Sequence, residues 1–296
     1  MVLALAGMVL LYAAFVGVAA SWATAELGSG GIAVVAVVAA LLLAAQYRSA
    51  PSAALKALDA ERVDRSEYPD LHARVDRLAN QAGVPAPDVA VAPHSGPNAF
   101  ATARGRDSAV VTVTDGLLAA VDGDELDAVL AHELAHVKHR DALVMSVVTV
   151  LVTVCAMVAR NFWWFGDGGG SNGGGGGSGD GGQPWFLVFV AVSLVAWFGG
   201  YLLTRVISRQ REFAADRGAA AITGDPGAMA SAIETISAGM AATPDDDLRD
   251  HAELNALFFA PADPKSRLLD AMRTHPDPER RVERLTQLAG ELETSE

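Results

Sequence analysis

The sequence predicts a mainly α-helical integral membrane protein, with about four transmembrane helices and a soluble α+β domain that a membrane hairpin divides into two halves. Two observations support this class. Hydrophobic residues make up 51% of the 296 residues, and they gather in four blocks instead of following amphipathic patterns. The sequence between the blocks is polar and has the composition of an ordinary soluble domain.

Three of the four apolar blocks approach the length of about 20 residues that crosses a bilayer. They cover residues 2–20, 142–159 and 185–203, and none of them contains a charged residue. The remaining block, residues 30–45, is the second along the chain, and it is shorter and rich in alanine. It either spans the bilayer with help from its flanks or forms a re-entrant or buried segment, and we count it as a span.

These blocks divide the chain into four parts. Residues 1–47 are predicted to form an N-terminal transmembrane hairpin, and residues 142–207 a second one. The loop of the second hairpin, residues 166–183, is rich in glycine, but no lysine follows it and no strand precedes it. It is therefore predicted to be a flexible linker and not a phosphate-binding loop. Residues 48–141 and 208–296 are expected to form the two halves of one domain.

The basic residues predict the orientation of the chain. Arginine and lysine flank the blocks on one side, whereas residues 21–29 and 161–184 contain neither, with Arg160 at the boundary as the exception. Because cytoplasmic loops carry the excess of basic residues, both termini and the soluble domain are predicted to lie in the cytoplasm of a multi-pass cell-membrane protein. The net charge of −13 argues against a nucleic-acid partner.

Short β-prone segments interrupt the helical pattern of the soluble domain. Residues 48–83 are predicted to be helical and to end at Gly83. Turn residues at 104–107 predict a hairpin within a small sheet. The β-prone segments are 89–92, 98–103 and 109–114.

Another helix is predicted to begin at Asp124 as its N-cap, with Glu125 in the first turn, and to run straight into the third block. After the fourth block the periodicity predicts three more helices. They cover residues 209–222, 227–241 and 278–294.

The predicted helix after the sheet contains the sequence His-Glu-Leu-Ala-His at residues 132–136. Residues four apart lie about 40° apart around a helix, so His132 and His136 project from one face and can hold one Zn²⁺. Glu133 is placed to take a proton from a water molecule that the zinc activates. The alternative is two surface histidines that flank a helical glutamate.

Catalytic zinc takes three protein ligands and leaves one position open. Glu212 is the best candidate for the third ligand, because it follows the fourth block on the same side of the membrane as His132. Asp216, one turn later, can accept a hydrogen bond from the free ring nitrogen of a ligand histidine. The alternative is that both are solvated carboxylates paired with nearby arginines, for which the candidates are Arg209, Arg211 and Arg217.

Four motifs, taken in their order along the chain, resemble those of HtpX-type membrane peptidases, which are relatives of the CAAX prenyl proteases. They are the His-Glu-Leu-Ala-His helix, Arg-Glu-Phe-Ala-Ala-Asp at 211–216, Pro-Asn-Ala-Phe-Ala-Thr at 97–102 and Thr-His-Pro at 274–276. The resemblance covers roughly residues 50–290. It implies a mainly helical zincin-like domain with a small sheet. It also implies one zinc ion per chain, bound by His132, His136 and Glu212, with Glu133 as the base and Asp216 as support.

The resemblance also suggests how a substrate is held. The segment from Asn98 through Ala99 and Phe100 resembles the family's active-site strand, which accepts a peptide as an added β-strand. Ala103 stands where the family pattern has glycine, and the alternative is a plain core strand. His275 resembles a family histidine near the developing oxyanion, although His-Pro is also common where helices start. His139 is expected to be an interfacial cation, since a fourth ligand would close the site.

The function that the resemblance implies is that of a zinc metalloendopeptidase, which hydrolyses peptide bonds with zinc-activated water. Its expected substrates are cytosolic regions of membrane proteins, in quality control or a stress response, and its other partner is the lipid bilayer. One alternative enzyme is a prenyl-protein peptidase, for which four spans are too few to build a lipid chamber. Another alternative is a noncatalytic scaffold with structural zinc, which would have no use for Glu133. A transporter would carry ionisable residues within its spans, and these blocks have none.

Overall fold

The computed structural model describes residues 31–103, 105–146, 184–242 and 277–294, together with residue 152 and a few positions between 10 and 21. The chain divides into two compact units. The first, here called the apolar unit, consists of Met1–Gln46 and Met145–Ile207. The second, here called the sheet unit, consists of Tyr47–Val144 and Ser208–Glu296.

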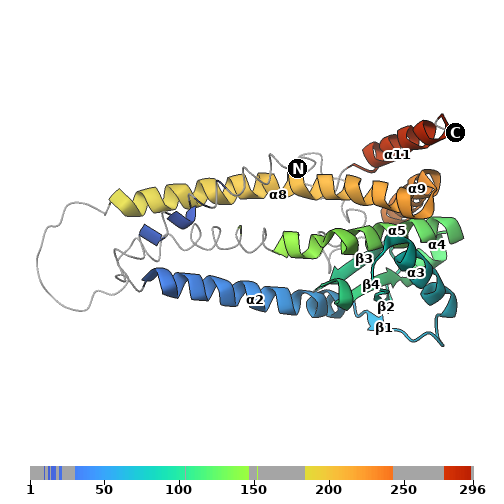
Figure 1. The fold of residues 1–296 in the computed structure, drawn as a ribbon, viewed down its shortest axis with the longest axis horizontal. Coiled ribbons are helices and arrows are strands. Elements are labelled where there is room, and N and C mark those ends of the chain that lie inside the picture. The colour runs from blue at the N-terminus through green and yellow to red at the C-terminus, as the bar shows by residue number, and fades with distance from the viewer. Residues whose placement is uncertain are drawn as a thin grey trace, which may run out of the picture. The chain divides into compact units, whose positions relative to one another are not determined.

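The sheet unit contains a four-stranded sheet with the strand order β1-β2-β4-β3 (Figure 1). Its strands are β1 (Glu61–Arg62), β2 (Asp88–Ala92), β3 (Ala99–Ala103) and β4 (Ala109–Thr114). β4 pairs parallel with β2 and antiparallel with β3, so the predicted hairpin is confirmed and β3 is an edge strand. β1 was not predicted, because two exposed residues show no pattern.

The first helical stretch is divided in the structure. Residues 48–83 were predicted as one helical run, but they contain the end of α2 (Gly31–Ala57), strand β1 and α3 (Pro69–Ala82). Asp59 has a positive φ of 47°, which no helix accommodates, and the proline at the start of α3 favours a new helix there. The predicted end at Gly83 is confirmed, since this residue caps α3 in the left-handed conformation.

The helix that carries residues 132–136 is α5 (Gly123–His139), which follows the short α4 (Asp115–Ala120). Its N-cap is Asp122 and not Asp124 as predicted: Asp122 and Glu125 form a capping box in which each side chain accepts from the other residue's backbone. The helix also does not run straight on, as we expected. Arg140 takes a left-handed conformation with φ 57° and ψ 39°, and a separate helical segment begins at 141.

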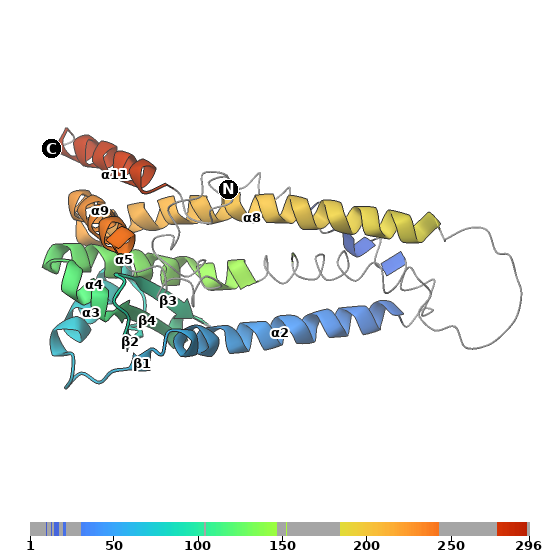
Figure 2. The ribbon, with the colours of Figure 1, turned by 180° about the vertical axis from the view of Figure 1, so that it is seen from behind.

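α5 is the central element of the sheet unit. It contacts β3, β4 and α3 on one side and α9 (Pro226–Ala242) on another (Figure 2). Leu130 and Leu134 are completely buried in the main core, which also includes Val111 and Val113 of β4. A helix covered on most sides normally carries only apolar residues, so the buried His132 and Glu133 of α5 stand out as functional candidates.

The sheet unit also contains the last part of α8 (Pro184–Thr223), from Ser208 on, and all of α11 (Pro278–Glu293). α8 is continuous, so the predicted block at 185–203 and the predicted helix at 209–222 are parts of one 40-residue helix. α11 packs on α9. A Cβ added at Gly218 of α8 would lie 2.7 Å from the Cβ of Ala135, so α8 and α5 approach each other closely at this point.

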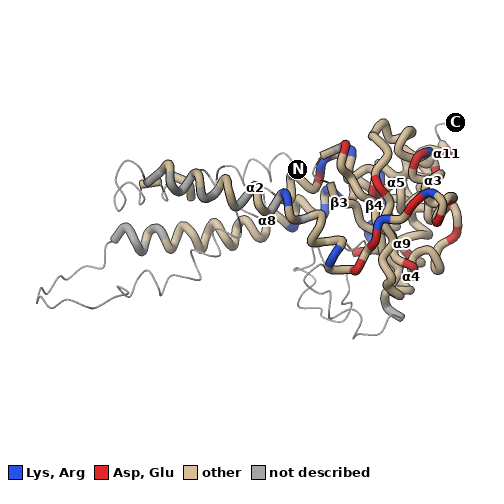
Figure 3. Tube along the Cα trace, turned by 90° about the horizontal axis from the view of Figure 1, so that it is seen from below, with Lys and Arg blue, Asp and Glu red and all other residues tan. Residues whose placement is uncertain are grey.

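In the apolar unit, α8 presents large hydrophobic side chains to its surroundings. Figure 3 shows no charged residue along most of α8 before the sheet unit, and Leu194, Val195 and Phe198 are exposed. Among the residues that the structure describes, one segment, Val190–Thr223, is long and apolar enough to cross a membrane, and only 28% of its apolar window is buried. Most of the predicted blocks at 2–20 and 142–159, and the loop at 166–183, lie outside the described residues.

Gly116 provides a test of the packing that holds the loop before β3. Its added Cβ would lie 2.0 Å from the carbonyl oxygen of Ser95, which is backbone and cannot move aside cheaply. Gly116→Ala is therefore expected to destabilise the chain by about 3 kcal/mol. Gly290→Ala is the matched control, because nothing lies within 4 Å of the added Cβ in α11 and alanine stabilises a helix by up to about 1 kcal/mol.

The measurement is thermal unfolding of both purified variants in detergent, followed by circular dichroism. A lower melting temperature for Gly116→Ala, with an equal or higher one for Gly290→Ala, is the expected result. Equal melting temperatures for both variants would contradict the close approach at Ser95.

Candidate metal centre

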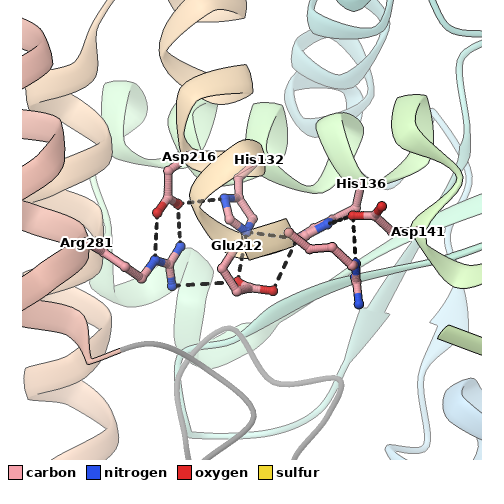
Figure 4. A network of polar contacts seen from close by, with 7 residues as sticks. His132, His136, Asp141, Glu212, Asp216 and Arg281 are labelled. Carbon is pink, nitrogen blue, oxygen red and sulfur yellow. Dashed lines mark hydrogen bonds and ion pairs between the residues drawn. The ribbon is translucent and has the colours of Figure 1, made fainter. Parts of the chain in front are cut away.

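Two histidines of α5 and one glutamate of α8 meet in the interior of the sheet unit (Figure 4). One donor atom from each of His132, His136 and Glu212 lies within 4.8 Å of the other two. His132 and Glu212 are buried and His136 is half-buried. The three residues that the sequence singled out as ligands thus lie together.

The donor atoms converge on one small region. Nε2 of His132 lies 3.5 Å from Oε2 of Glu212, and Nε2 of His136 lies 3.7 Å from Oε1 of the same carboxylate. The two Nε2 atoms are 3.1 Å apart. A single ion placed between them can therefore be reached by all three side chains.

Each histidine has a carboxylate behind it. Nδ1 of His132 lies 3.0 Å from Oδ1 of Asp216, as the sequence suggested for that aspartate. Nδ1 of His136 lies 2.6 Å from Oδ2 of Asp141, a residue that sequence analysis did not single out. No local pattern signalled Asp141, because residues five apart lie about 140° apart around an uninterrupted helix. The left-handed turn at Arg140 brings the Asp141 carboxylate next to His136.

Each of these carboxylates is in turn paired with an arginine. Arg281 of α11 is only 2% exposed and holds Asp216 with two bonds, from Nε at 2.9 Å and from Nη2 at 2.6 Å. Nε of Arg211 lies 3.0 Å from Oδ2 of Asp141. Figure 4 shows the pairs around Asp216 and Asp141 on opposite sides of the two histidines.

The alternative that Glu212 and Asp216 are solvated carboxylates is wrong. Both are buried. Arg281, which is not one of the three arginines named in that alternative, bonds to Asp216, and its Nη1 lies 3.9 Å from Oε2 of Glu212. Sequence reasoning could not find this partner, since Arg281 lies 65 residues after Asp216.

These contacts shift the pKa values of two carboxylates and one histidine. Burial raises the pKa of Asp216, but the Arg281 charge and the contact with His132 outweigh it, so the pKa is lowered. The pKa of Asp141 is also lowered, since His136 and Arg211 outweigh its burial. Burial lowers the pKa of His132, but Asp216 and Glu212 more than compensate and raise it to about 9.

The donor set fits a divalent cation. With both Nδ1 atoms turned to carboxylates, the two Nε2 atoms face each other at 3.1 Å, and two lone pairs at this distance repel unless a proton or a cation lies between them. In the absence of a cation His132 keeps its proton up to a pKa of about 9, because Asp216 and Glu212 outweigh the effect of its burial. Two imidazoles and one carboxylate are a usual ligand set for catalytic zinc, and other divalent ions also accept it.

Glu133 directly follows His132 in α5. Its side chain is buried, and its charge is among those that raise the pKa of Arg281 against the effect of burial. A buried carboxylate in the same helix as two ligand histidines is a suitable acceptor for a proton from a bound water.

The other predicted residues have varied positions. Asn98 is buried just before β3, where its backbone N–H donates to Oγ1 of Thr114 at 2.9 Å and its carbonyl accepts from the Thr114 N–H at 3.0 Å. Ala99 and Phe100 are buried in the edge strand, which contacts α5. His139 is exposed and does not belong to the donor group, and His275 lies outside the described residues.

The chain is similar to known proteins along most of its length. Residues 65–289 match peptidase family M48. A protein named Protease HtpX homolog from Moorella thermoacetica is 42% identical over 257 residues, which are 87% of this chain and 84% of that protein. Protease HtpX homolog 2 from Methanosarcina mazei is 40% identical over 252 residues, which are 85% of this chain and 83% of that protein.

A solved structure has a similar fold. The crystal structure of S. mikatae Ste24p superposes with a TM-score of 0.51 at 16% sequence identity. The match covers 93% of this chain and 61% of that chain, so the present chain spans about three fifths of its length. At this identity the likeness concerns the fold alone.

The high pKa of His132 predicts how the affinity for zinc depends on pH. Because the pKa in the metal-free fold is raised from 6.5 to about 9, protonation stabilises this fold fully below pH 6.5, and the stabilisation is lost as pH rises through about 9. Zinc competes with that proton, so the apparent affinity should rise by up to about tenfold per pH unit below pH 9 and then level off. Competition titrations with a zinc chelator across this range measure it.

Glu234→Gln, at an exposed glutamate of α9 outside the donor group, is the control and should show the same pH dependence as the wild-type chain. An apparent affinity of the wild-type chain that no longer rises above about pH 7 would contradict the raised pKa, because an unperturbed histidine is already neutral there.

Proposed function

Because the chain belongs to peptidase family M48 and is a membrane metalloprotease of the HtpX type, we propose that it is a zinc endopeptidase centred on His132, His136, Glu212 and Glu133. One observation carries this proposal: donor atoms of two imidazoles and one carboxylate lie within 4.8 Å of one another, and the buried Glu133 directly follows His132 in α5. A purely structural zinc site usually has four protein ligands and needs no such base.

His132, His136 and Glu212 would hold the zinc ion. When bound, zinc acts as a Lewis acid that polarises the substrate carbonyl and lowers the pKa of a water in the site to about 7. Asp216 supports His132 by holding its Nδ1, so that Nε2 is the ring nitrogen directed to the ion. Arg281 keeps Asp216 ionised for this role.

Glu133 is the proposed base. It takes a proton from the attacking water while the water oxygen bonds to the peptide carbonyl carbon. It then delivers that proton to the leaving amine as the carbon–nitrogen bond breaks. His275 is proposed to stabilise the oxyanion that develops between these two events, by its resemblance to the family histidine.

The substrate peptide is proposed to bind along β3 as an added strand. β3 is at the edge of the sheet and contacts α5, which carries both histidines. The peptide would then be held by main-chain hydrogen bonds along the edge of β3 that faces away from β4, with Ala99 as the first candidate, since the backbone groups of Asn98 already bond to Thr114. Because such bonds do not read side chains, cleavage would have broad sequence specificity.

The membrane arrangement is also a proposal. The apolar blocks and the exposed side chains of α8 support a multi-pass protein, and the basic flanks support cytoplasmic termini and a cytoplasmic active site. From this arrangement we propose that the substrates are cytosolic regions of membrane proteins, cleaved in quality control or a stress response. The second hairpin would then connect the two halves of the peptidase domain.

The first test concerns Glu133. In detergent, the wild-type chain and Glu133→Gln should each retain one equivalent of zinc, because glutamine does not disturb the ligands. Casein cleavage by Glu133→Gln should fall by at least about 100-fold, since the proton transfer is lost. His132→Ala should lose both the zinc ion and casein cleavage.

Glu234→Gln is the matched control, because Glu234 is an exposed glutamate on α9. It should cleave casein like the wild type. Comparable cleavage by Glu133→Gln would refute the proposed role of Glu133, and a wild-type chain that binds no zinc would refute the proposed centre.

The second test concerns orientation. In a chain with Cys155→Ser, a cysteine introduced at Ser171 in the glycine-rich loop should react with a membrane-impermeant maleimide added to intact cells. A cysteine introduced at Ser295 should react only after the cells are opened, because the positive-inside rule places this end in the cytoplasm. The reverse pattern would contradict the proposed topology.

A further inference from the structure

We infer that Asp141 is a positioning residue of the metal centre, which fixes His136 for zinc in the way that Asp216 fixes His132. The inference rests on the proposed function, because it concerns a ligand of the proposed ion. It adds a residue that lies outside the motif His-Glu-Leu-Ala-His and outside the segment that carries Glu212.

Asp141 and His136 are joined by a short hydrogen bond. The Nδ1–H of His136 donates to Oδ2 of Asp141 at 2.6 Å, and Asp141 is buried. This bond selects the tautomer in which Nε2 carries a free lone pair, and that atom points to Nε2 of His132 and to Glu212. Without it, a neutral His136 could carry its proton on Nε2, where it would oppose a cation.

The turn at Arg140 is what places Asp141 there. Arg140 is an exposed arginine in the left-handed conformation, which residues other than glycine rarely adopt. Its backbone N–H donates to Val137, and the following helical segment begins at 141. The turn places the Asp141 carboxylate at the end of α5, beside His136. In an uninterrupted helix the two side chains would point in different directions.

Arg211 then connects this carboxylate to the third ligand. Its Nε lies 3.0 Å from Oδ2 of Asp141, and the next residue in α8 is Glu212. The same oxygen therefore accepts from His136 on α5 and contacts Arg211 on α8. Asp141 thus positions His136 and fixes it relative to the helix turn that supplies Glu212.

The centre consequently has two matching arrangements. Behind His132 lie Asp216 and Arg281, and behind His136 lie Asp141 and Arg211. In each of them a carboxylate orients the imidazole, and an arginine orients the carboxylate and balances its charge.

The experiment compares zinc affinity in the full chain in detergent. Metal-stripped wild type, Asp141→Asn and Asp127→Asn are titrated with zinc against a chelator of known affinity. Asp127 is the matched control, because it pairs with Arg74 and Arg77 in the same unit but does not contact the metal centre. Asp141→Asn should bind zinc about 10–100-fold more weakly, and Asp127→Asn should bind like the wild type.

Two further readouts separate positioning from a general loss of stability. The rise in melting temperature on adding zinc should be smaller for Asp141→Asn than for Asp127→Asn, whatever the melting temperatures of the metal-free chains. The absorption spectrum of the cobalt-substituted chain should change in Asp141→Asn alone, because only that substitution alters a ligand's surroundings.

Substitutions at Arg140 test the same inference without touching a polar group of the centre. Arg140→Gly keeps the left-handed turn and should retain wild-type zinc affinity, whereas Arg140→Val opposes the turn and should weaken it. If Asp141→Asn and Arg140→Val both bind zinc as tightly as the wild type, the inference is overturned. The proposed function would still stand, provided that the wild type binds one zinc and Glu133→Gln abolishes cleavage. A wild type without zinc would overturn both.

Discussion

The sheet unit depends on the burial of negative charge at its centre. Glu133, Glu212, Asp141 and Asp216 are all buried, and an unpaired carboxylate in a protein interior costs several kcal/mol. Two guanidinium groups compensate part of this charge, which leaves a net charge of −2 when the imidazoles are neutral. A divalent cation balances that remainder, so the affinity for metal follows from the same charges that constrain the fold.

The surrounding helices are arranged to maintain these pairs. Small residues let α5 and α8 approach closely, as Ala135 and Gly218 show, and this brings the ligands of both helices within reach of one ion. α11 supplies Arg281 from a distant part of the sequence, and Arg284 of the same helix lies 3.8 Å over the ring of Phe213 in α8. The C-terminal helix is thus part of the centre and not an appendage to it.

Local features of the fold and the site could be predicted from the sequence, and features set by distant contacts could not. The β3–β4 hairpin follows from turn residues between two β-prone segments, and the two histidines follow from a helical spacing of four. Asp141 was missed because a single left-handed residue, Arg140, cancels the helical periodicity on which the prediction relied. Arg281 was missed because nothing in a sequence pairs residues 65 positions apart. The spans outside the described residues stay predictions.

The late position of Arg281 has a consequence for biosynthesis. A ribosome that adds about 5–20 residues per second takes several seconds to extend the chain from Asp216 to Arg281. During this interval the nascent chain already contains both histidines and Glu212. Arg281, the buried partner of Asp216, has not yet been added. In a polypeptide released before residue 281, the carboxylate of Asp216 would lack the arginine that neutralises it, so its burial beside His132 would cost free energy that the full chain does not lose.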